Sequence, residues 1–209
     1  RFIGPINFYS ALMKLNLAFY QREDVVEVAK DLLGKCLFTR FDNKVTAGII
    51  TETEAYAGTG DRASHAFGGR RTARTEVMYS AGGIAYVYLC YGIHSLFNVV
   101  TNVEGVPHAV LIRAVYPVRG LETILERRKI KTNDPAKISP GPGTVSKGLG
   151  IHFSHSGLSL IGNKIWIEDS GLEINEKELV IGPRVGVDYA GLDALLPYRF
   201  KLPKGFSKV

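Results

Sequence analysis

Apolar and polar residues alternate along several stretches of the chain with the two-residue period of a half-buried β-strand. The clearest stretch is 84–90, IAYVYLC, where Tyr86 and Tyr88 share one face and Val87 and Leu89 share the other. Stretches of this kind, bounded by turn residues, predict strands at 35–40, 45–56, 84–90, 95–103, 107–117, 164–169 and 179–187. Because short links join the three strands between 84 and 117, we expect an antiparallel meander there.

A different spacing, with apolar residues three and four positions apart, predicts helices at 22–34 and 119–129. In the first of these, REDVVEVAKDLLG, Asp24 can cap the first turn with Glu27 three residues later. Gly34 follows the last apolar residue and is expected to end the helix.

The remaining segments are predicted loops, one of them rich in glycine at 58–69 and another, rich in proline and glycine, that opens a short helix near Thr144. The chain contains no repeat and no linker. We therefore predict a single α+β domain over residues 13–209, with a curved antiparallel sheet, a protruding β-hairpin and peripheral helices. Residues 1–12 are expected to be an N-terminal extension.

Composition narrows the class of protein. With 209 residues, 45% hydrophobic and 22% charged, the chain can bury a full core. Two cysteines, Cys36 and Cys90, lie in apolar runs and are too few for a disulfide framework, which favours a reducing intracellular compartment. The histidines lack metal-ligand spacing, and the longest apolar stretch, 8–21, is interrupted by Lys14 and too short to cross a membrane.

Net positive charge favours a polyanionic partner. The formal charge is +6, and the segment 119–147 carries much of the excess, in part through the basic run 127–131. Three arginines, Arg70, Arg71 and Arg74, form a second cluster in GGRRTART. Clusters of this kind are typical of surfaces that bind nucleic acids, and an ordinary solvated surface is the alternative.

Candidate chemistry gathers in the segment 52–69, ETEAYAGTGDRASHAFGG, where a predicted strand runs into a loop. Glu52, Glu54 and Tyr56 share one face of this strand, and we expect that face to be open because the residues between them would face the core. A carboxylate at the end of a strand can act as a general base. The alternative is a structural acid paired with a cation such as Arg113.

Aromatic and polar residues on the neighbouring strands enlarge this group. Tyr91 lies at the tip of the predicted hairpin, where it has little core to join, so contact with a partner is favoured. Asn98 and Arg113 are polar residues on inner strands, where a polar side chain without a hydrogen-bond partner destabilises the fold. We therefore expect each of them to have a partner or a function. His65, taken alone, is more simply a hydrogen-bonded structural histidine. The tyrosines that could stack on bases, or else fill the core, are Tyr56, Tyr86 and Tyr88.

Seven blocks of sequence, ETEAY, SHAFGGRRTART, YVYLCYG, FNVV, VLIRAV, GPGTVSKGLGI and PRVGVDYAG, together resemble the alkyladenine (3-methyladenine) DNA glycosylase family of mammals and bacteria. The resemblance covers residues 19–200 and implies a single glycosylase domain without helix-hairpin-helix element, metal or cofactor. It further implies an enzyme, which we expect to be monomeric, that flips alkylated adenine or guanine, or hypoxanthine, out of double-stranded DNA. Such an enzyme hydrolyses the N-glycosidic bond and leaves the strand uncut.

The same resemblance assigns roles to individual residues. Glu54 matches the base that activates water, and Arg113 and the backbone of Val187 match groups that hold this water. Tyr91 matches the side chain wedged into the minor groove. The residues that match the base pocket are Tyr56, His65, Tyr88 and Asn98, the last of which crowds the exocyclic amine of guanine. The other residues expected at the DNA are Ile93 and His94 at the hairpin tip, and Arg70, Arg74 and the run 127–131 near phosphates.

Two other functions remain compatible with the residues alone. A non-catalytic nucleic-acid-binding module would need the basic and aromatic residues but not Glu54. A nucleoside hydrolase would need Glu54 but neither the basic clusters nor Tyr91. The chain also departs from the mammalian relatives at Asp188 and Tyr189, where those carry glycine and histidine. We expect the protein in the cytoplasm, with the nucleoid, if it is bacterial, and in the nucleus if it is eukaryotic.

Overall fold

The computed structural model describes residues 13–132 and 134–203, so the extension expected over residues 1–12 lies outside it. The strands are β1 (Met13–Lys14), β2 (Cys36–Phe41), β3 (Lys44–Tyr56), β4 (Ala85–Cys90), β5 (His94–Thr101), β6 (His108–Arg119), β7 (Ile165–Asp169), β8 (Val180–Gly182) and β9 (Arg199–Lys201). The helices are α1 (Leu17–Tyr20), α2 (Val25–Asp31), α3 (Leu121–Arg128) and α4 (Pro142–Leu149), joined by short 3₁₀ turns.

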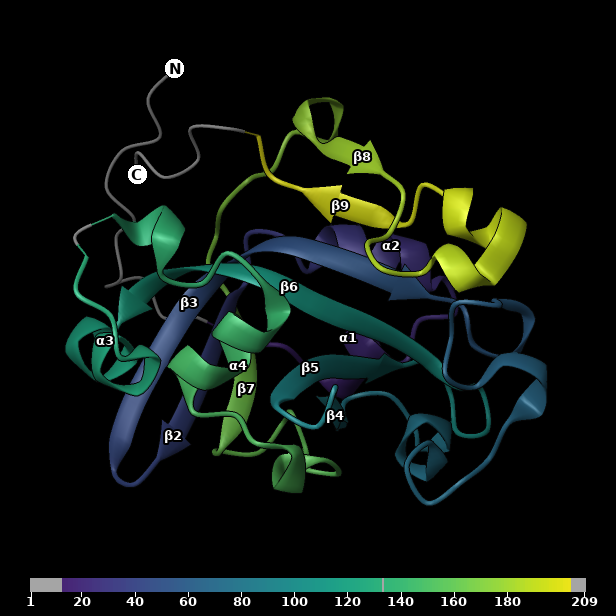
Figure 1. The fold of residues 1–209 in the computed structure, drawn as a ribbon, viewed down its shortest axis with the longest axis horizontal. Helices are drawn as coiled ribbons and strands as arrows, with labels where there is room; N and C mark the ends of the chain where they lie inside the picture. The colour runs from purple at the N-terminus through teal and green to yellow at the C-terminus, as the bar shows by residue number, and fades with distance from the viewer. Residues whose placement is uncertain (1–12, 133, 204–209) are drawn as a thin grey trace.

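The described strands form one sheet in the order β1-β7-β2-β3-β6-β5-β4, with β9 paired to both β3 and β8 (Figure 1). Their pairings are antiparallel, and the predicted meander is present as β4, β5 and β6. Helix α4 lies in front of the strands in Figure 1 and α2 lies behind them. The prediction of a mixed fold with a large antiparallel sheet and few helices is confirmed.

Local sequence signals explain where the helices begin and end. The Asp24 side chain accepts hydrogen bonds from the backbone N–H groups of Val26 (2.8 Å) and Glu27 (3.1 Å), which caps α2 as predicted. Gly34 has a φ of +78° and turns the chain into β2. At α4, the Thr144 side chain accepts a hydrogen bond from the Gly141 N–H at 3.0 Å, so this helix also begins where the sequence indicates.

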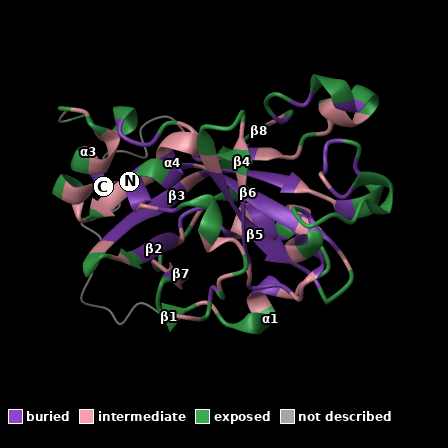
Figure 2. Cartoon of the chain, turned by 60° about the horizontal axis from the view of Figure 1, so that its bottom comes forward, coloured by how far each residue is buried: buried purple, intermediate pink, exposed green. Residues whose placement is uncertain are grey.

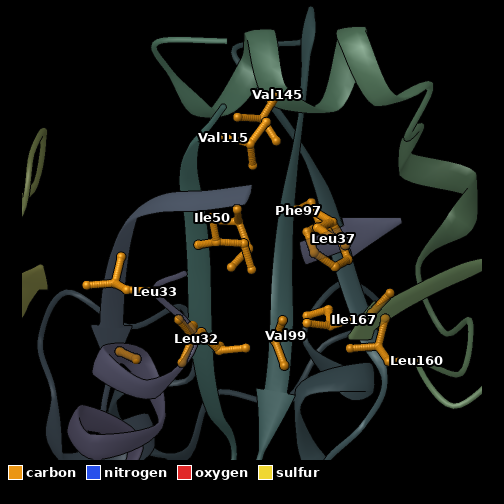
Figure 3. Packing of buried hydrophobic residues seen from close by; sticks show 14 of the residues in the cluster. Leu32, Leu33, Leu37, Ile50, Phe97, Val99, Val115, Val145, Leu160 and Ile167 are labelled. Carbon is orange, nitrogen blue, oxygen red and sulfur yellow. The ribbon is translucent and has the colours of Figure 1, made fainter. Parts of the chain in front are cut away.

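The largest group of buried apolar side chains joins both helical layers to the sheet (Figure 3). Leu32 at the end of α2, Ile50 on β3 and Phe97 on β5 are buried in it, and Val145 on α4 closes it from the other side. Burying one such side chain stabilises the fold by roughly 1.5–3 kcal/mol. Figure 2 shows the buried residues concentrated on the strands, while exposed residues follow the loops. The strands therefore form a rigid platform for any site at their edges.

One predicted strand is mostly wrong. The stretch 179–187 was expected to be extended throughout, but β8 ends at Gly182. Pro183 lacks the N–H that a ladder needs, and Gly186 has a φ of +74°, so the chain leaves the sheet. Residues 183–187 instead cross the end of β3, where Val185 and Arg184 contact Glu54 and Ala55. Among the described residues, no helix is both long and apolar enough to span a membrane.

The pairing of β3 with β6 is irregular between Ala47 and Gly48 and again around Glu52. Its register shifts on both sides of Glu52, which pairs with Ala114, while Thr53 pairs with Ile112. Arg113 is therefore an extra residue on β6 at this point. Bulges re-aim side chains and are common beside active sites. Here the bulge lies next to the two carboxylates that the sequence singled out.

Candidate active site

A cavity of about 230 Å³ opens where β3, β4, β5 and β6 meet the loops around residues 63–65 and 185–189. The candidate residues that line it are Tyr56, His65, Tyr88, Tyr91, Asn98, Arg113 and Val187. The structure thus brings together every residue proposed for the pocket, although they are spread over four strands and two loops. Pro142 at the start of α4 and Tyr189 also border this cavity.

Glu54 lies directly behind the lining of this cavity and is fully buried. One carboxylate oxygen, Oε2, accepts a hydrogen bond from the Tyr56 hydroxyl at 2.9 Å. The other, Oε1, accepts one from the Val185 N–H at 2.8 Å and lies 3.3 Å from Nη1 of Arg113. These three partners of Glu54 all line the cavity, so the carboxylate is one layer away from any ligand held there.

The expectation of an open face on β3 is therefore wrong in one respect. Glu52, Glu54 and Tyr56 do act from one side of the strand, but Glu52 and Glu54 are buried. The sequence pattern could not reveal what covers them. Strand β9 pairs with β3 at both glutamates, and the segment 183–187 places the Val185 N–H on Glu54.

Burial sets the protonation behaviour of Glu54. Loss of water around the carboxylate raises its pKa above the ordinary value, and this effect exceeds the opposing influence of Arg113 and of the hydrogen bonds from Val185 and Tyr56. A carboxylate with a raised pKa is a stronger base when it is ionised. Glu54 thus combines fixed geometry with increased basicity.

His65 is held neutral by its surroundings. Burial, together with the positive charges of Arg74 and Arg70, lowers its pKa to about 4. Its Nδ1 lies 2.8 Å from the Tyr86 hydroxyl, and Nη2 of Arg74 lies 2.8 Å from its Nε2. Because an arginine can only donate, Nε2 is the acceptor, and Nδ1 carries the proton that is donated to Tyr86.

The aromatic rings that line the cavity are not arranged as two parallel planes. The rings of His65 and Tyr88 meet edge to face at 82°, with centroids 4.6 Å apart. A purine stacked between two rings needs them about 7 Å apart, twice the contact distance of ~3.5 Å. The rings of His65 and Tyr88 are closer than that, so in this arrangement they do not form the two sides of a sandwich. Tyr86 is buried and belongs to an apolar cluster, so of the three tyrosines that could stack or fill the core it fits the core alternative, although it also borders the cavity. Tyr56 and Tyr88 are half-buried and face the cavity.

A buried ion pair near the cavity was not found from the sequence. Arg184 is buried and forms a two-pronged pair with Asp61, in which its Nη2 donates to Oδ1 at 2.8 Å. It also donates to the carbonyl of Ala55 at 2.9 Å, and its guanidinium lies 4.8 Å from the centre of the Tyr56 ring. The pair ties the loop after β3 to the segment that covers Glu54. The only available signal was a lone arginine in PRVGV.

The hairpin tip lies at the mouth of the cavity. Tyr91 is 92% exposed and Ile93 72%, and His94 beside them is exposed as well. Tyr91 has a φ of +50° and Gly92 of +72°, the backbone of a tight hairpin turn that glycine favours and tyrosine tolerates poorly. The prediction that Tyr91 is an exposed tip residue is confirmed, and the turn directs it away from the core.

The basic clusters divide into two kinds. Arg70 and Arg74 are exposed on the loop beside the cavity. Arg127 and Arg128 are half-buried on α3 and hold the protein's own oxygens, since Nε of Arg128 donates to the Ile138 carbonyl at 2.8 Å and Arg127 donates to the Gly148 carbonyl at 3.4 Å. These two arginines thus brace α3 against its neighbours with part of their donors, and the expectation that the run 127–131 lies near phosphates stays a prediction.

The cavity is aromatic and has a buried carboxylate behind it, while exposed arginines and an apolar hairpin tip lie beside it. The sequence profile of the methylpurine-DNA glycosylase family matches residues 18–205. The chain belongs to this family, and it is accordingly a DNA N-glycosylase of base excision repair that acts on DNA. Membership decides against a purely binding module and against a nucleoside hydrolase.

Bacterial relatives agree with this assignment. A provisionally named 3-methyladenine DNA glycosylase of Chlamydia felis is 43% identical over 185 residues, which cover 88% of this chain and 94% of the relative. One of Bacillus thuringiensis is 44% identical over 190 residues, with 88% and 92% covered. A third, from Natranaerobius thermophilus, is 42% identical over 178 residues, with 85% and 89% covered.

Proposed function

We propose that this glycosylase removes damaged purines, namely alkylated adenine and guanine and hypoxanthine, from double-stranded DNA, with Glu54 as the base that activates water. The observation that carries the proposal is the position of Glu54 behind an aromatic cavity, with three of its contacts fixed by Tyr56, Val185 and Arg113. A structural acid would need none of the aromatic lining in front of it.

Base extrusion begins the reaction, because an enzyme cannot reach a glycosidic bond inside a stacked duplex. Unstacking costs a few kcal/mol, and less when the base is damaged or mispaired. Tyr91 projects from the hairpin tip at the mouth of the cavity, where it can fill the gap left in the stack. Arg70 and Arg74 lie beside the same mouth and can neutralise the phosphates of the displaced strand.

The cavity then holds the purine against Tyr56, His65 and Tyr88. Stacking on an aromatic side chain contributes roughly 1–3 kcal/mol per base. The faces of these rings also attract the positive charge of an alkylated purine. Asn98 selects against guanine because its amide is fixed, with Nδ2 donating to the carbonyls of Tyr86 at 3.1 Å and Leu96 at 3.3 Å. A fixed group cannot move aside for an exocyclic amine.

The chemical step uses one water molecule. Its oxygen bonds to C1′ of the sugar as the bond from C1′ to the purine nitrogen breaks, and its proton passes to Glu54. The electron pair of the broken bond stays on the purine, which makes a cationic alkylpurine neutral. An ionised carboxyl group has about four acceptor positions. Tyr56, Val185 and Arg113 use three of them, which leaves one for the water, and this water must reach Glu54 between those three residues.

The transition state at C1′ carries positive charge, as in glycoside hydrolysis, so the Glu54 carboxylate also stabilises it electrostatically. Arg113 and the backbone of Val187 are proposed to hold the water on the cavity side. Cutting of the DNA strand by these enzymes would require an amine that attacks C1′. The lining of the cavity in the described residues contains no lysine, which favours simple hydrolysis.

One assay tests the proposal. The protein is incubated with a duplex that contains a single hypoxanthine or alkylated adenine, and the strand is then analysed with and without hot alkali. The expected product is an intact strand with an abasic site that alkali cleaves. Strand breaks without alkali would contradict simple hydrolysis, and failure to release either base would contradict the proposed substrates.

A further inference from the structure

Glu52 is the second buried carboxylate of β3, and the reaction described above gives it no part. It is 6% exposed and contacts three cations. Its Oε1 accepts a hydrogen bond from Nε of Arg113 at 3.1 Å and from Nη1 of Arg199 at 3.3 Å, and its Oε2 lies 3.8 Å from Nζ of Lys201. Glu52 does not line the cavity beside Glu54 but borders a separate pocket of about 190 Å³ together with Ala114 and Lys201, so it can reach Glu54 only through its partners and its charge.

Arg113 connects the two carboxylates of β3. Its Nε contacts Glu52 and its Nη1 contacts Glu54 at 3.3 Å, so the guanidinium lies between them. A guanidinium is a rigid plane, and fixing one nitrogen fixes the direction of the others. Arg113 also lies at the bulge of β6, where regular pairing does not hold its backbone in register. The anchor of this arginine is therefore Glu52.

Besides anchoring Arg113, Glu52 affects Glu54 through its negative charge. Arg113, Arg199 and Lys201 bring three positive charges to this end of β3, and Glu52 contacts all three. Without its negative charge, these cations would act on Glu54 alone. Their unopposed field would favour the ionised form of Glu54 and make it a weaker base.

We propose that Glu52 is a positioning residue for the glycosylase reaction, which aims Arg113 at Glu54 and keeps Glu54 basic by balancing the neighbouring cations. The inference rests on the proposed role of Glu54 as base. In this role Glu52 contacts neither the substrate nor the water. It affects Glu54 through Arg113, which contacts both carboxylates, and through the electrostatic effect of its own charge.

The charged and titratable groups that face Glu54 can be named for each neighbouring element. Strand β3 contributes Glu52 and Tyr56, β6 contributes Arg113, and the segment after β8 contributes Arg184. Strand β9 contributes Arg199, opposite Glu54, and Lys201, opposite Glu52. Burial and the neighbouring Glu54 raise the pKa of Tyr56 well above its ordinary value, so it stays protonated. We therefore assign the fall of the rate in acid, the acid limb, to the protonation of Glu54, whose pKa is raised by burial, whereas the pKa of His65 in the cavity wall is lowered to about 4.

The test is the pH dependence of single-turnover base release from a duplex with 7-methylguanine, whose ring is already cationic and needs no acid. In Glu52→Gln we expect the acid limb to move to lower pH by on the order of one unit, the effect of removing a unit charge several ångströms away at an effective dielectric constant of ~20. The plateau rate falls as well, because Glu54 is a weaker base and Arg113 is no longer aimed.

A second variant reverses the sign. Lys201→Met removes a cation from Glu52 without altering Glu52 or Arg113, so the limb should move to higher pH, by less than in Glu52→Gln because Lys201 is half exposed. Glu27→Gln is the matched control: it deletes an exposed glutamate, paired with Lys30 on α2, and should leave the limb in place. Melting temperatures show whether each variant is folded.

Each outcome decides the inference. A limb that stays in place in Glu52→Gln, or that moves to higher pH, overturns it, since a merely structural residue would lower the rate without moving the limb. If Glu52→Gln does not fold, a limb that stays in place or moves to lower pH in Lys201→Met overturns it. Glu54→Gln is measured in parallel: full activity there would refute Glu54 as the base, whereas loss of activity there with an unmoved limb in Glu52→Gln refutes only the role of Glu52.

Discussion

The region behind the cavity and the hairpin tip at its mouth are built in opposite ways. Behind the cavity, Glu54 is fully buried and its contacts come from β3, β6 and the segment after β8. At the tip, Tyr91 is 92% exposed in a backbone conformation with a φ of +50°. The contacts of the proposed base are thus complete within the protein, whereas the tip exposes an apolar surface to solvent.

The two regions therefore differ in how much they reduce the stability of the folded protein. Burying Glu54 opposes folding at neutral pH, because desolvation penalises its ionised form. Tyr91, by contrast, makes few contacts within the protein, and its proposed contribution is made only in the complex with DNA. Changes behind the cavity should therefore alter rate and stability together, while changes at the tip should alter function alone. Each of the following predictions tests one side of this contrast.

The largest effect is expected for Glu54→Gln. This substitution keeps the shape of the side chain and removes the base, so single-turnover base release should fall by about 10²–10⁴-fold, the usual contribution of a general base. Binding to lesion-containing duplex, measured by fluorescence anisotropy, should be retained. A variant within a few-fold of the wild-type rate would remove Glu54 from the mechanism.

The same variant should be at least as stable as the wild type at neutral pH. The pKa of Glu54 is raised in the folded protein, so the carboxyl group stabilises the fold when protonated, and this contribution is lost as pH rises through the folded pKa. The melting temperature of Glu54→Gln should exceed or equal that of the wild type at neutral pH, and the difference should shrink in acid. A lower melting temperature at neutral pH would contradict this sign.

The next largest effect is expected for Arg184→Ala, which leaves Asp61 buried without its partner. Breaking a buried ion pair in this way costs about 3–5 kcal/mol of unfolding free energy. Arg71→Ala is the matched control, since it breaks the exposed pair with Glu76 and should cost about 0–1 kcal/mol. Urea denaturation measures both, and equal costs would mean that the loop and the segment over Glu54 do not depend on Arg184.

A smaller effect is expected for Asn98→Ser, which removes the fixed amide from the cavity. Relief of a clash of this kind is worth roughly 1–3 kcal/mol of discrimination. Release of normal guanine from undamaged duplex should therefore increase relative to the release of alkylated bases. If guanine release is unchanged, the selectivity must come from another part of the pocket.

The smallest effect on stability is expected for Tyr91→Ala, at roughly 0.5 kcal/mol or less, as for most surface sites. Excision should nevertheless fall, and it should fall more for a well-paired lesion than for a mispaired one, because the mispaired base is already easier to extrude. Thermal melting and single-turnover excision on two duplexes measure this. A large loss of stability without dependence on pairing would place Tyr91 among the structural residues and pass the wedge role to Ile93 or His94.

The parts of the fold that the sequence predicts are those set by local patterns. The cap of α2 at Asp24, the turn at Gly34 that follows α2 and the hairpin with Tyr91 at its tip each follow from residues that are close in the chain. The sharing of one side of β3 by Glu52 and Glu54 follows from the strand period in the same way. These features need no knowledge of tertiary contacts.

The parts that could not be predicted depend on contacts between distant segments. Arg184 and Asp61 are 123 positions apart, and no periodicity links them. The burial of Glu54 depends on the segment 183–187, which alternates like a strand but leaves the sheet at Pro183. The aromatic pocket follows only from resemblance to a family, since each tyrosine taken alone fits a core position better.

The most direct test of the central claim, that a buried carboxylate must be ionised for base release, is the pH dependence of the wild-type reaction. Single-turnover release of 7-methylguanine from a duplex is measured between about pH 4 and about pH 8, around the carboxyl range, with circular dichroism to confirm that the protein stays folded. The account predicts that the rate falls in acid with an apparent pKa above the ordinary value for glutamate, and that His65 adds no limb near neutrality because its pKa is lowered to about 4. A rate that stays constant down to the lowest pH at which the protein is folded would contradict it.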